Sequence, residues 1–229
     1  MREATQQLLS GGPLVVGTVH SAGSLALAGT LLPGEVDVLE YRIDSLAEII
    51  GDAERAVIAS RIPVLLTVRH PDEGGSAPLD AVQRKALYRR FIPRAAFVDI
   101  ELRSLPEFAD VLKDARRAGC GVIVSSHDFS ETPPSAEIDE RQGEAFEAGA
   151  DIFKIACLTS TAGDLARLLD FTERPAGGLH SVMGMGRFGR VSRLALAEAG
   201  SVLNYGYLDA PNAPGQWEAR ELRRLIARK

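Results

Sequence analysis

The chain has 229 residues, of which 45% are hydrophobic and 25% charged, with a formal net charge of −5. This length and composition predict a single globular domain over residues 1–229. Without long runs of like charge, the sequence favours neither a nucleic-acid nor a membrane partner. The absence of a long apolar stretch and of a secretory pattern predicts a cytoplasmic protein. Cys120 and Cys157 lie apart, without a CxxC or Cys/His cluster, and are expected to be free thiols outside any metal site.

Short apolar runs alternate with longer amphipathic segments along the chain. The predicted strands are Leu14–His20, Val38–Asp44, Val64–Arg69, Ala96–Leu102, Gly121–Asp128, Ile152–Leu158, His180–Gly186 and Ser201–Leu208. Most of these runs are almost continuously apolar, which is typical of parallel strands covered by helices. Predicted helices include Leu79–Phe91, Pro106–Ala118, Ile138–Ala148, Ala162–Phe171, Arg190–Ala199 and a closing helix after Glu218. Glycines that suit helix C-caps follow three of them: Gly119, Gly149 and Gly200.

Eight units of strand and helix predict a (β/α)8 barrel, which belongs to the α/β class. A doubly wound open sheet is the alternative architecture. It is disfavoured because no GxGxxG motif follows the first predicted strand.

Lys154 differs from the other three lysines because it lies within an apolar run, Asp151-Ile-Phe-Lys-Ile-Ala-Cys-Leu158. Burial of a lysine disfavours the charged form and lowers the pKa of the amine. The amine can then attack a carbonyl carbon to form a Schiff base. A lysine that reaches solvent from the strand end, or pairs with a carboxylate, fits the same run. The strand alone leaves both interpretations open.

Polar residues are concentrated where the predicted strands end, which is where (β/α)8 barrels carry their active sites. The second strand ends Glu40-Tyr-Arg42-Ile-Asp44, and the fifth ends Ser125-Ser-His127-Asp128. Glu40 and Arg42 share one face of their strand, where charges are costly unless they meet each other or a polar ligand. We expect His127 and Lys154 to lie at matching depths on adjacent strands, with the imidazole serving proton transfer at the amine.

The order and spacing of these motifs resemble type I 3-dehydroquinate dehydratase, the Schiff-base-forming enzyme of the shikimate pathway and of aromatic amino acid biosynthesis. The resemblance runs from Leu14 to about Trp217. It rests on Glu40-Tyr-Arg42-Ile-Asp44, Thr67-Val-Arg69 with Glu73, Ser125-Ser-His127-Asp128-Phe, Lys154, Met183-Gly-Met-Gly, Ser192-Arg193 and Ala213-Pro-Gly-Gln216. The resemblance implies a (β/α)8 barrel that uses no metal or organic cofactor. It also implies that the protein is a lyase that dehydrates 3-dehydroquinate to 3-dehydroshikimate.

By the same resemblance, Lys154 is the Schiff-base lysine, His127 the general acid/base, and Glu73 the carboxylate that tunes the histidine. The chemistry agrees, because a protonated imine at Lys154 would act as an electron sink and acidify the carbon next to it. His127 could then take the alpha proton and return it to the departing hydroxyl.

The resemblance also implies how the substrate is held. Glu40, Arg42 and Arg69 would bind the ring hydroxyls, and Arg193 with Gln216 the carboxylate, for which a guanidinium offers a planar fork. Asn212 stands where the family usually has serine, in the lid segment Asn212-Ala-Pro-Gly-Gln216. An asparagine can still donate a hydrogen bond there, although it is larger.

Two other functions stay open. A class I Schiff-base aldolase could hold a sugar phosphate at Gly184, Gly186 and Gly189, although the arginines, expected from three separate strands, suit a ring better. The second alternative function is a barrel that binds a ligand without catalysing a reaction. The expected partner is a small-molecule substrate, and a homodimer is compatible with the sequence.

Overall fold

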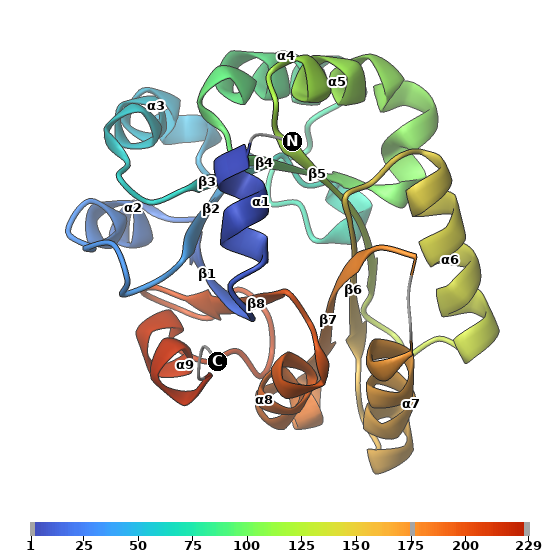
Figure 1. The fold of residues 1–229 in the computed structure, drawn as a ribbon. Helices are drawn as coiled ribbons and strands as arrows, with labels where there is room; N and C mark the ends of the chain where they lie inside the picture. Colours follow the sequence, from blue (N-terminus) through green and yellow to red (C-terminus); the bar gives the residue numbers. More distant parts are fainter. Residues whose placement is uncertain (1–2, 175–176, 227–229) are drawn as a thin grey trace.

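The structure, a computed structural model, describes residues 3–174 and 177–226 and contains a sheet of eight parallel strands curved into a barrel (Figure 1). The strand order is β7-β6-β5-β4-β3-β2-β1-β8. The strands are β1 (Leu14–Val19), β2 (Val38–Arg42), β3 (Val64–Thr67), β4 (Phe97–Glu101), β5 (Gly121–Asp128), β6 (Ile152–Leu158), β7 (Leu179–Met185) and β8 (Leu203–Tyr207). Each lies where a strand is predicted, and the predicted (β/α)8 architecture is confirmed.

The barrel closes between β7 and β8 with few hydrogen bonds. The amide of Val202 donates to the carbonyl of His180 at 3.0 Å, and the hydroxyl of Ser181 donates to the carbonyl of Leu203 at 2.6 Å. On its other side β8 pairs with β1 along a full parallel ladder. Because the strands follow one another in chain order, the doubly wound open sheet is excluded.

Helices surround the barrel (Figure 1). They are α1 (Glu3–Leu9), α2 (Ala22–Ala28), α3 (Ile50–Ala59), α4 (Ala81–Phe91), α5 (Leu105–Arg117), α6 (Ser135–Glu147), α7 (Ala162–Glu173), α8 (Gly189–Ala199) and α9 (Ala219–Leu225). The sequence analysis predicts α4 to α9 but not α1 to α3. The first two have only seven residues each, too few for a clear apolar period. α1 lies across the N-terminal end of the barrel, where Leu9 contacts the interior core.

The predicted helix C-cap glycines are confirmed by their backbone conformation. Gly119, Gly149 and Gly200 follow α5, α6 and α8 with φ values of 76°, 86° and 119°. Residues with a Cβ atom rarely adopt such positive φ values. These glycines therefore turn the chain from each helix into the next strand.

Layers of side chains from alternate strands fill the barrel interior, as in other barrels of this type. A fully buried apolar layer comes from the even-numbered strands: Val38, Phe97, Ile152 and Leu203. Two residues further along the same strands the layer is polar and buried: Glu40, Asp99, Lys154 and Tyr205. We call this second set the charged layer. Since residues two apart on a strand face the same side, the apolar layer forms its floor.

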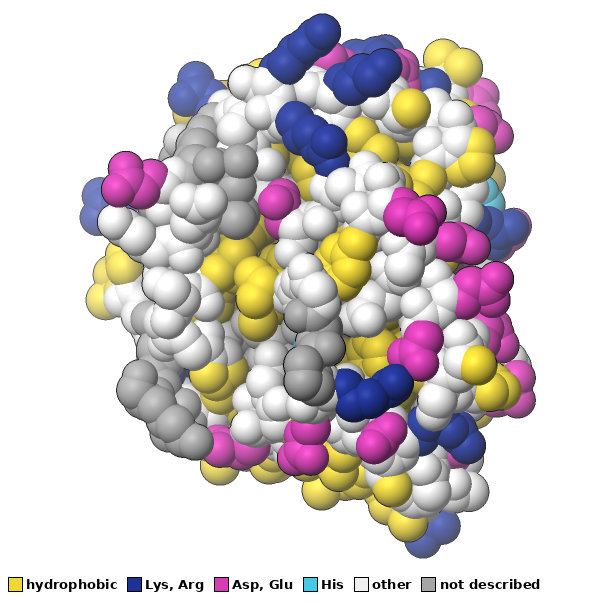
Figure 2. All heavy atoms as spheres, turned by 45° about the vertical axis from the view of Figure 1, so that its right-hand side comes forward, with side chains coloured by type: hydrophobic (Ala, Val, Ile, Leu, Met, Phe, Trp, Pro, Cys, Tyr) yellow, Lys and Arg dark blue, Asp and Glu magenta, His cyan; other side chains and the backbone are white. Residues whose placement is uncertain are grey.

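The surface carries mixed charges. On the face in Figure 2, basic, acidic and hydrophobic side chains are interspersed among neutral ones. The exposed large hydrophobic side chains are spread over several elements: Leu32, Ile58, Val82, Phe129, Val191 and Leu225. Among the described residues, no helix combines the length and apolar character that crossing a bilayer requires. The cytoplasmic location and the homodimer stay predictions.

The interior apolar layers should dominate stability. Leu65 on β3 is fully buried in the barrel interior, whereas Leu32 is 63% exposed. Leu65→Ala should lower the free energy of unfolding by about 2–5 kcal/mol, because it leaves a cavity that the barrel cannot fill. The matched Leu32→Ala variant should stay within about 0.5 kcal/mol of wild type. Equilibrium urea unfolding measures both, and equal losses would contradict this description of the core.

Candidate active site

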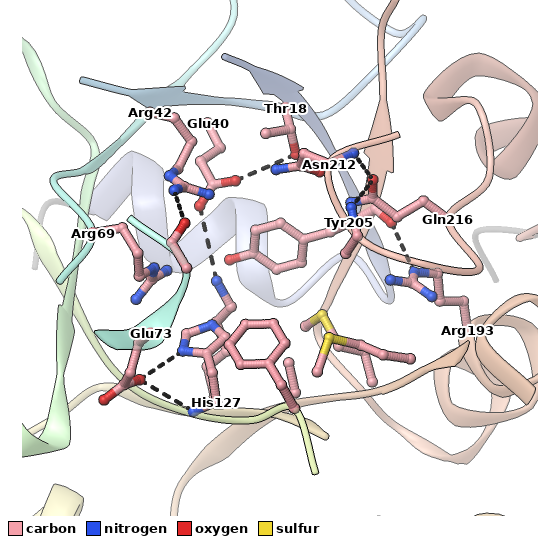
Figure 3. A pocket seen from close by; sticks show the side chains of 17 residues that line it. Thr18, Glu40, Arg42, Arg69, Glu73, His127, Arg193, Tyr205, Asn212 and Gln216 are labelled. Atoms are coloured by element: carbon pink, nitrogen blue, oxygen red, sulfur yellow. Dashed lines mark hydrogen bonds and ion pairs between the residues drawn. The ribbon is translucent and has the colours of Figure 1, made fainter. Parts of the chain in front are cut away.

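All nine residues that the sequence analysis assigns to the site line one cavity at the C-terminal ends of the strands (Figure 3). They are Glu40, Arg42, Arg69, Glu73, His127, Lys154, Arg193, Asn212 and Gln216. Strands β2, β5 and β6, the segment after β3, helix α8 and the loop after β8 contribute them. The structure thus brings the predicted residues together, while their individual roles stay predictions.

Lys154 lies at the centre of the charged layer and contacts its three other members. Its Nζ donates to Asp99 Oδ2 at 2.7 Å and lies 3.8 Å from Glu40 Oε1. The ring centroid of Tyr205 is 4.1 Å from the same nitrogen. The lysine is only 3% exposed, so carboxylates and an aromatic face replace water as its surroundings.

Asp99 also binds Arg69, which enters the barrel from the segment after β3. The two arginine Nη atoms donate to the two oxygens of Asp99 at 3.1 and 3.0 Å, and Nη1 also donates to Glu101 at 3.0 Å. Burial would raise the pKa of Asp99, but the charges of Arg69 and Lys154 hold it well below its usual range. Asp99 is therefore a carboxylate that connects two buried cations.

Glu40 and Arg42 lie on β2 but do not pair with each other. Glu40 accepts hydrogen bonds from the hydroxyls of Thr67 at 2.9 Å and Thr18 at 3.3 Å. The guanidinium of Arg42 forms a bidentate pair with Asp44, at 3.0 and 2.8 Å. Each charge is thus fixed in place before a ligand arrives.

His127 is oriented by Glu73, which lies in the short turn Pro71–Glu73. The ring Nδ1 and the backbone amide of His127 lie 2.9 and 3.2 Å from Glu73 Oε2. Burial raises the pKa of Glu73 to about 7. Burial, followed by the charges of Arg69 and Lys154, lowers the pKa of His127 well below its ordinary value. At neutral pH the imidazole is therefore uncharged, and when Nδ1 donates to an ionised Glu73, Nε2 is free to accept a proton.

The expectation that His127 and Lys154 lie at matching depths is wrong. In the β5–β6 ladder Lys154 pairs with Ser125, and His127 pairs with Ala156. The two side chains share a face but are offset by two residues, about 6.6 Å along the strand. The stagger of strands around a barrel, which the sequence does not reveal, causes this offset. The histidine therefore lies nearer the mouth, above the charged layer.

Arg193 lies on α8, so the expectation that the three arginines come from three strands is also wrong. Its Nε donates to the carbonyl of Tyr205 at 3.0 Å. Nη1 donates to the carbonyls of Gly184, Gly189 and Gly215 at 3.0, 2.8 and 2.9 Å. Burial lowers its pKa to about 10, so it is still charged at neutral pH. Among the described residues no carboxylate forms an ion pair with it, and a buried cation in this state suits an anionic ligand group.

The segment Asn212–Gln216 covers the cavity beside Arg193. Gln216 Oε1 accepts from the backbone amides of Asn212 and Ala213 at 2.9 and 3.3 Å, which closes a tight loop. The side-chain NH2 group of Gln216 is then the part that can donate to a ligand. Pro214 accepts from the amide of Gly186 at 3.1 Å, so the segment is tied to the turn after β7.

The three glycines proposed to cradle a phosphate use their amides inside the protein. Gly184 donates to the hydroxyl of Ser192 at 3.1 Å, Gly186 to the carbonyl of Pro214 at 3.1 Å, and Gly189 to the carbonyl of Gly186. A phosphate cradle needs such amides to point at the ligand. The structure therefore does not favour the sugar-phosphate aldolase.

The sequence analysis does not identify Asp99, Glu101 or Tyr205. The alternation in Phe97-Val-Asp99-Ile-Glu101, with two carboxylates on one face of a buried strand, is a signal that could have found the first two. Tyr205 gives no such signal, since an aromatic residue in an apolar strand is ordinary. Cys120 and Cys157 are both buried, and Cys157 is a free thiol, as predicted. Within residues 3–174 and 177–226, no group of three or more His, Cys, Asp or Glu side chains could hold a metal ion.

Comparison with known proteins gives a consistent result. Residues 14–227 match the family model described as type I 3-dehydroquinase. The 3-dehydroquinate dehydratase of Methanosarcina barkeri is 38% identical over 207 residues, which cover 83% of this chain and 84% of that protein. The 3-dehydroquinate dehydratase of Geobacillus kaustophilus superposes with a TM-score of 0.84 at 27% identity, covering 93% and 90% of the two chains. The type I enzyme of Clostridium difficile, solved with covalently modified comenic acid, has a TM-score of 0.83 at 26% identity and coverage of 94% and 92%.

The raised pKa of Glu73 should appear in the pH dependence of stability. Because this pKa rises from 4.5 to about 7 on folding, the folded protein holds a proton that the unfolded chain loses between these values. The resulting stabilisation is complete below about pH 4.5 and disappears as pH rises through about 7. Glutamine cannot ionise, so Glu73→Gln should gain stability relative to wild type by on the order of 3 kcal/mol between pH 4.5 and pH 8.

Chemical denaturation at a series of pH values tests this difference. The control is Glu147→Gln, an exposed position on α6, for which the difference from wild type should stay within about 0.5 kcal/mol throughout. If the free energies of unfolding of Glu73→Gln and wild type change with pH in parallel, Glu73 ionises as an ordinary carboxylate.

Proposed function

The chain belongs to the type I 3-dehydroquinase family, and we propose that it removes water from 3-dehydroquinate to give 3-dehydroshikimate through a Schiff base at Lys154. The supporting observation is the convergence of Lys154, His127 and Arg193 on one buried cavity. They are a candidate nucleophile, a neutral base and a cation that has no carboxylate partner within the described part of the chain. Relatives that carry the name 3-dehydroquinate dehydratase, and a covalent ligand in the Clostridium difficile enzyme, agree with the proposal.

The first step is imine formation. Lys154 gives a proton to His127, and its Nζ adds to the ketone carbon of the substrate to form a carbinolamine. His127 can accept this proton, because burial and the neighbouring cations keep its imidazole neutral. It returns the proton to the carbinolamine hydroxyl, which leaves as water and gives a protonated imine and a neutral His127. Asp99 holds Nζ at a fixed place through its 2.7 Å contact, which restricts the direction of attack.

The second step removes water across the ring. The protonated imine acidifies the adjacent C–H, His127 takes that proton, and the electrons form an enamine. The hydroxyl beta to the imine carbon then leaves as water with the proton from His127, giving a conjugated iminium. Addition of water releases the enone and restores the amine of Lys154. The water lost in imine formation is returned here, so the net reaction loses one water.

Substrate recognition follows the charges around the cavity. Arg193 supplies a charged donor for the ring carboxylate, with the NH2 group of Gln216 and the side chain of Asn212 beside it in the covering segment. Glu40 and Arg42 face the hydroxyl groups from β2. Arg69 lines the same cavity, although Asp99, Glu101 and Ser125 already accept bonds from both of its Nη atoms. We therefore assign Arg69 mainly to holding Asp99 in position.

Borohydride trapping tests the covalent step. In the presence of 3-dehydroquinate, the reduced adduct should appear on the peptide that contains Lys154, and Lys154→Met should lose both turnover and adduct. The control is Lys113→Met, which changes an exposed lysine on α5. This variant should form the reduced adduct at Lys154 and convert 3-dehydroquinate at the wild-type rate. His127→Ala should still form the imine, with turnover lower by about two to four orders of magnitude. An adduct on a different lysine would contradict the proposal.

Substitution of Arg193 tests carboxylate recognition. Arg193→Lys keeps a positive charge but loses the planar fork, and charge-assisted hydrogen bonds are worth about 1.5–3 kcal/mol. The apparent dissociation constant for 3-dehydroquinate should rise about tenfold or more. A hydroxylated cyclohexanone without the carboxylate should bind the variant and wild type equally. A similar loss for both ligands would place the carboxylate elsewhere.

A further inference from the structure

Tyr205 is the fourth member of the charged layer and has no role in the steps described above. It lies on β8, is 3% exposed and lines the cavity. In Figure 3 its ring crosses the base of the site, with the hydroxyl on the side of Glu40 and Arg69. The ring centroid lies 4.1 Å from the nucleophilic nitrogen of Lys154. A group that becomes bonded to that nitrogen therefore lies next to the phenol.

The hydroxyl of Tyr205 is buried and, among the described residues, no atom forms a hydrogen bond with it. A buried hydroxyl without a partner costs about 1–3 kcal/mol, so such groups are rare in native proteins. The other polar members of the layer are bonded: Glu40 to two threonines, and Asp99 to Lys154 and Arg69. A phenylalanine would provide the same ring without this cost, so the hydroxyl needs an explanation.

The phenol is a hydrogen-bond donor and not a proton donor. Burial, followed by the negative charges of Glu40 and Asp99, raises the pKa of Tyr205 well above its ordinary value. A tyrosinate beside these two carboxylates would be unfavourable, so the proton stays on the phenol oxygen throughout the reaction. Its O–H bond is available to any oxygen that gains negative charge nearby, and the low local dielectric strengthens such a contact.

We propose that the Tyr205 hydroxyl donates a hydrogen bond to the ketone oxygen of the substrate while Lys154 adds to its carbon, an inference that rests on the proposed Schiff-base function. As the C–N bond forms, the π electrons of the C=O bond move to the oxygen. Tyr205 stabilises this oxyanion and keeps its own proton. The oxygen then takes the proton that Nζ releases, which gives the neutral carbinolamine. Tyr205 thereby becomes a catalytic residue for imine formation, beside His127, which carries protons in this step and in the later elimination.

Tyr205→Phe tests the proposal because it removes only the hydroxyl. With enzyme in excess over 3-dehydroquinate, quenching with borohydride at increasing times gives the rate of imine formation, and absorbance of the enone gives the rate of elimination. The rate of imine formation should fall about 10- to 100-fold, the value of a hydrogen bond to a charged oxygen. Once formed, the imine should eliminate water at the wild-type rate. The melting temperature should not fall, since the lost hydroxyl has no partner among the described residues.

The matched control is Tyr207→Phe, two residues further along β8 and not among the residues that line the cavity. It should form the imine at the wild-type rate. The proposal is overturned if Tyr205→Phe forms the imine within twofold of wild type, or if it slows imine formation and elimination equally while lowering the melting temperature. If wild type itself gives no adduct at Lys154, the proposed function fails and this inference with it. If wild type gives the adduct at Lys154 and Tyr205→Phe forms the imine at the wild-type rate, this inference fails but the proposed function stands.

Discussion

The contact of Asp99 with both Lys154 and Arg69 is the interaction on which the site depends. A single buried carboxylate would be strongly unfavourable, and so would either cation alone. Together they form a compact network in which Asp99 accepts from Lys154 at 2.7 Å and from Arg69 at 3.0 and 3.1 Å. The network also fixes the position of Lys154 Nζ above the apolar floor of the barrel. The stability of the site and the proposed chemistry therefore rest on the same contacts.

The same cations also set the protonation of the groups nearer the mouth. Burial and the charges of Arg69 and Lys154 keep His127 neutral, whereas burial raises the pKa of Glu73 to about 7. The histidine can thus act as a base, and the contact with Glu73 can stabilise the imidazolium that forms when it takes a proton. When Lys154 becomes a neutral amine, one of the charges that disfavour imidazolium disappears. A neutral amine at Lys154 would therefore favour protonation of His127.

The strands could largely be predicted from the sequence, because each is an apolar run, and Lys154 could be singled out because it interrupts one. Glu40, Arg42 and His127 could be noticed because they are polar residues near strand ends. The remaining site residues are predicted by the family resemblance and not by the strand pattern. The offset between His127 and Lys154 could not be predicted, since strand stagger depends on how the whole barrel closes. That the Tyr205 hydroxyl finds no hydrogen-bond partner in the described part of the chain is equally a property of the folded interior. Arg193 lies on α8, within the predicted helix Arg190–Ala199, so the expectation that it comes from a strand disagrees with the helix pattern as well as with the structure.

Arg193 contacts the segment that covers the cavity. Its Nη1 donates to the carbonyls of Gly184 and Gly189 and to the carbonyl of Gly215 in the covering segment. These carbonyl dipoles offset the buried charge only in part, so an anionic group in the cavity adds the missing counter-charge. A carboxylate held there would strengthen the position of the guanidinium and, through it, of Gly215. A carboxylate bound beside Arg193 would thus be coupled electrostatically to the segment that covers the cavity.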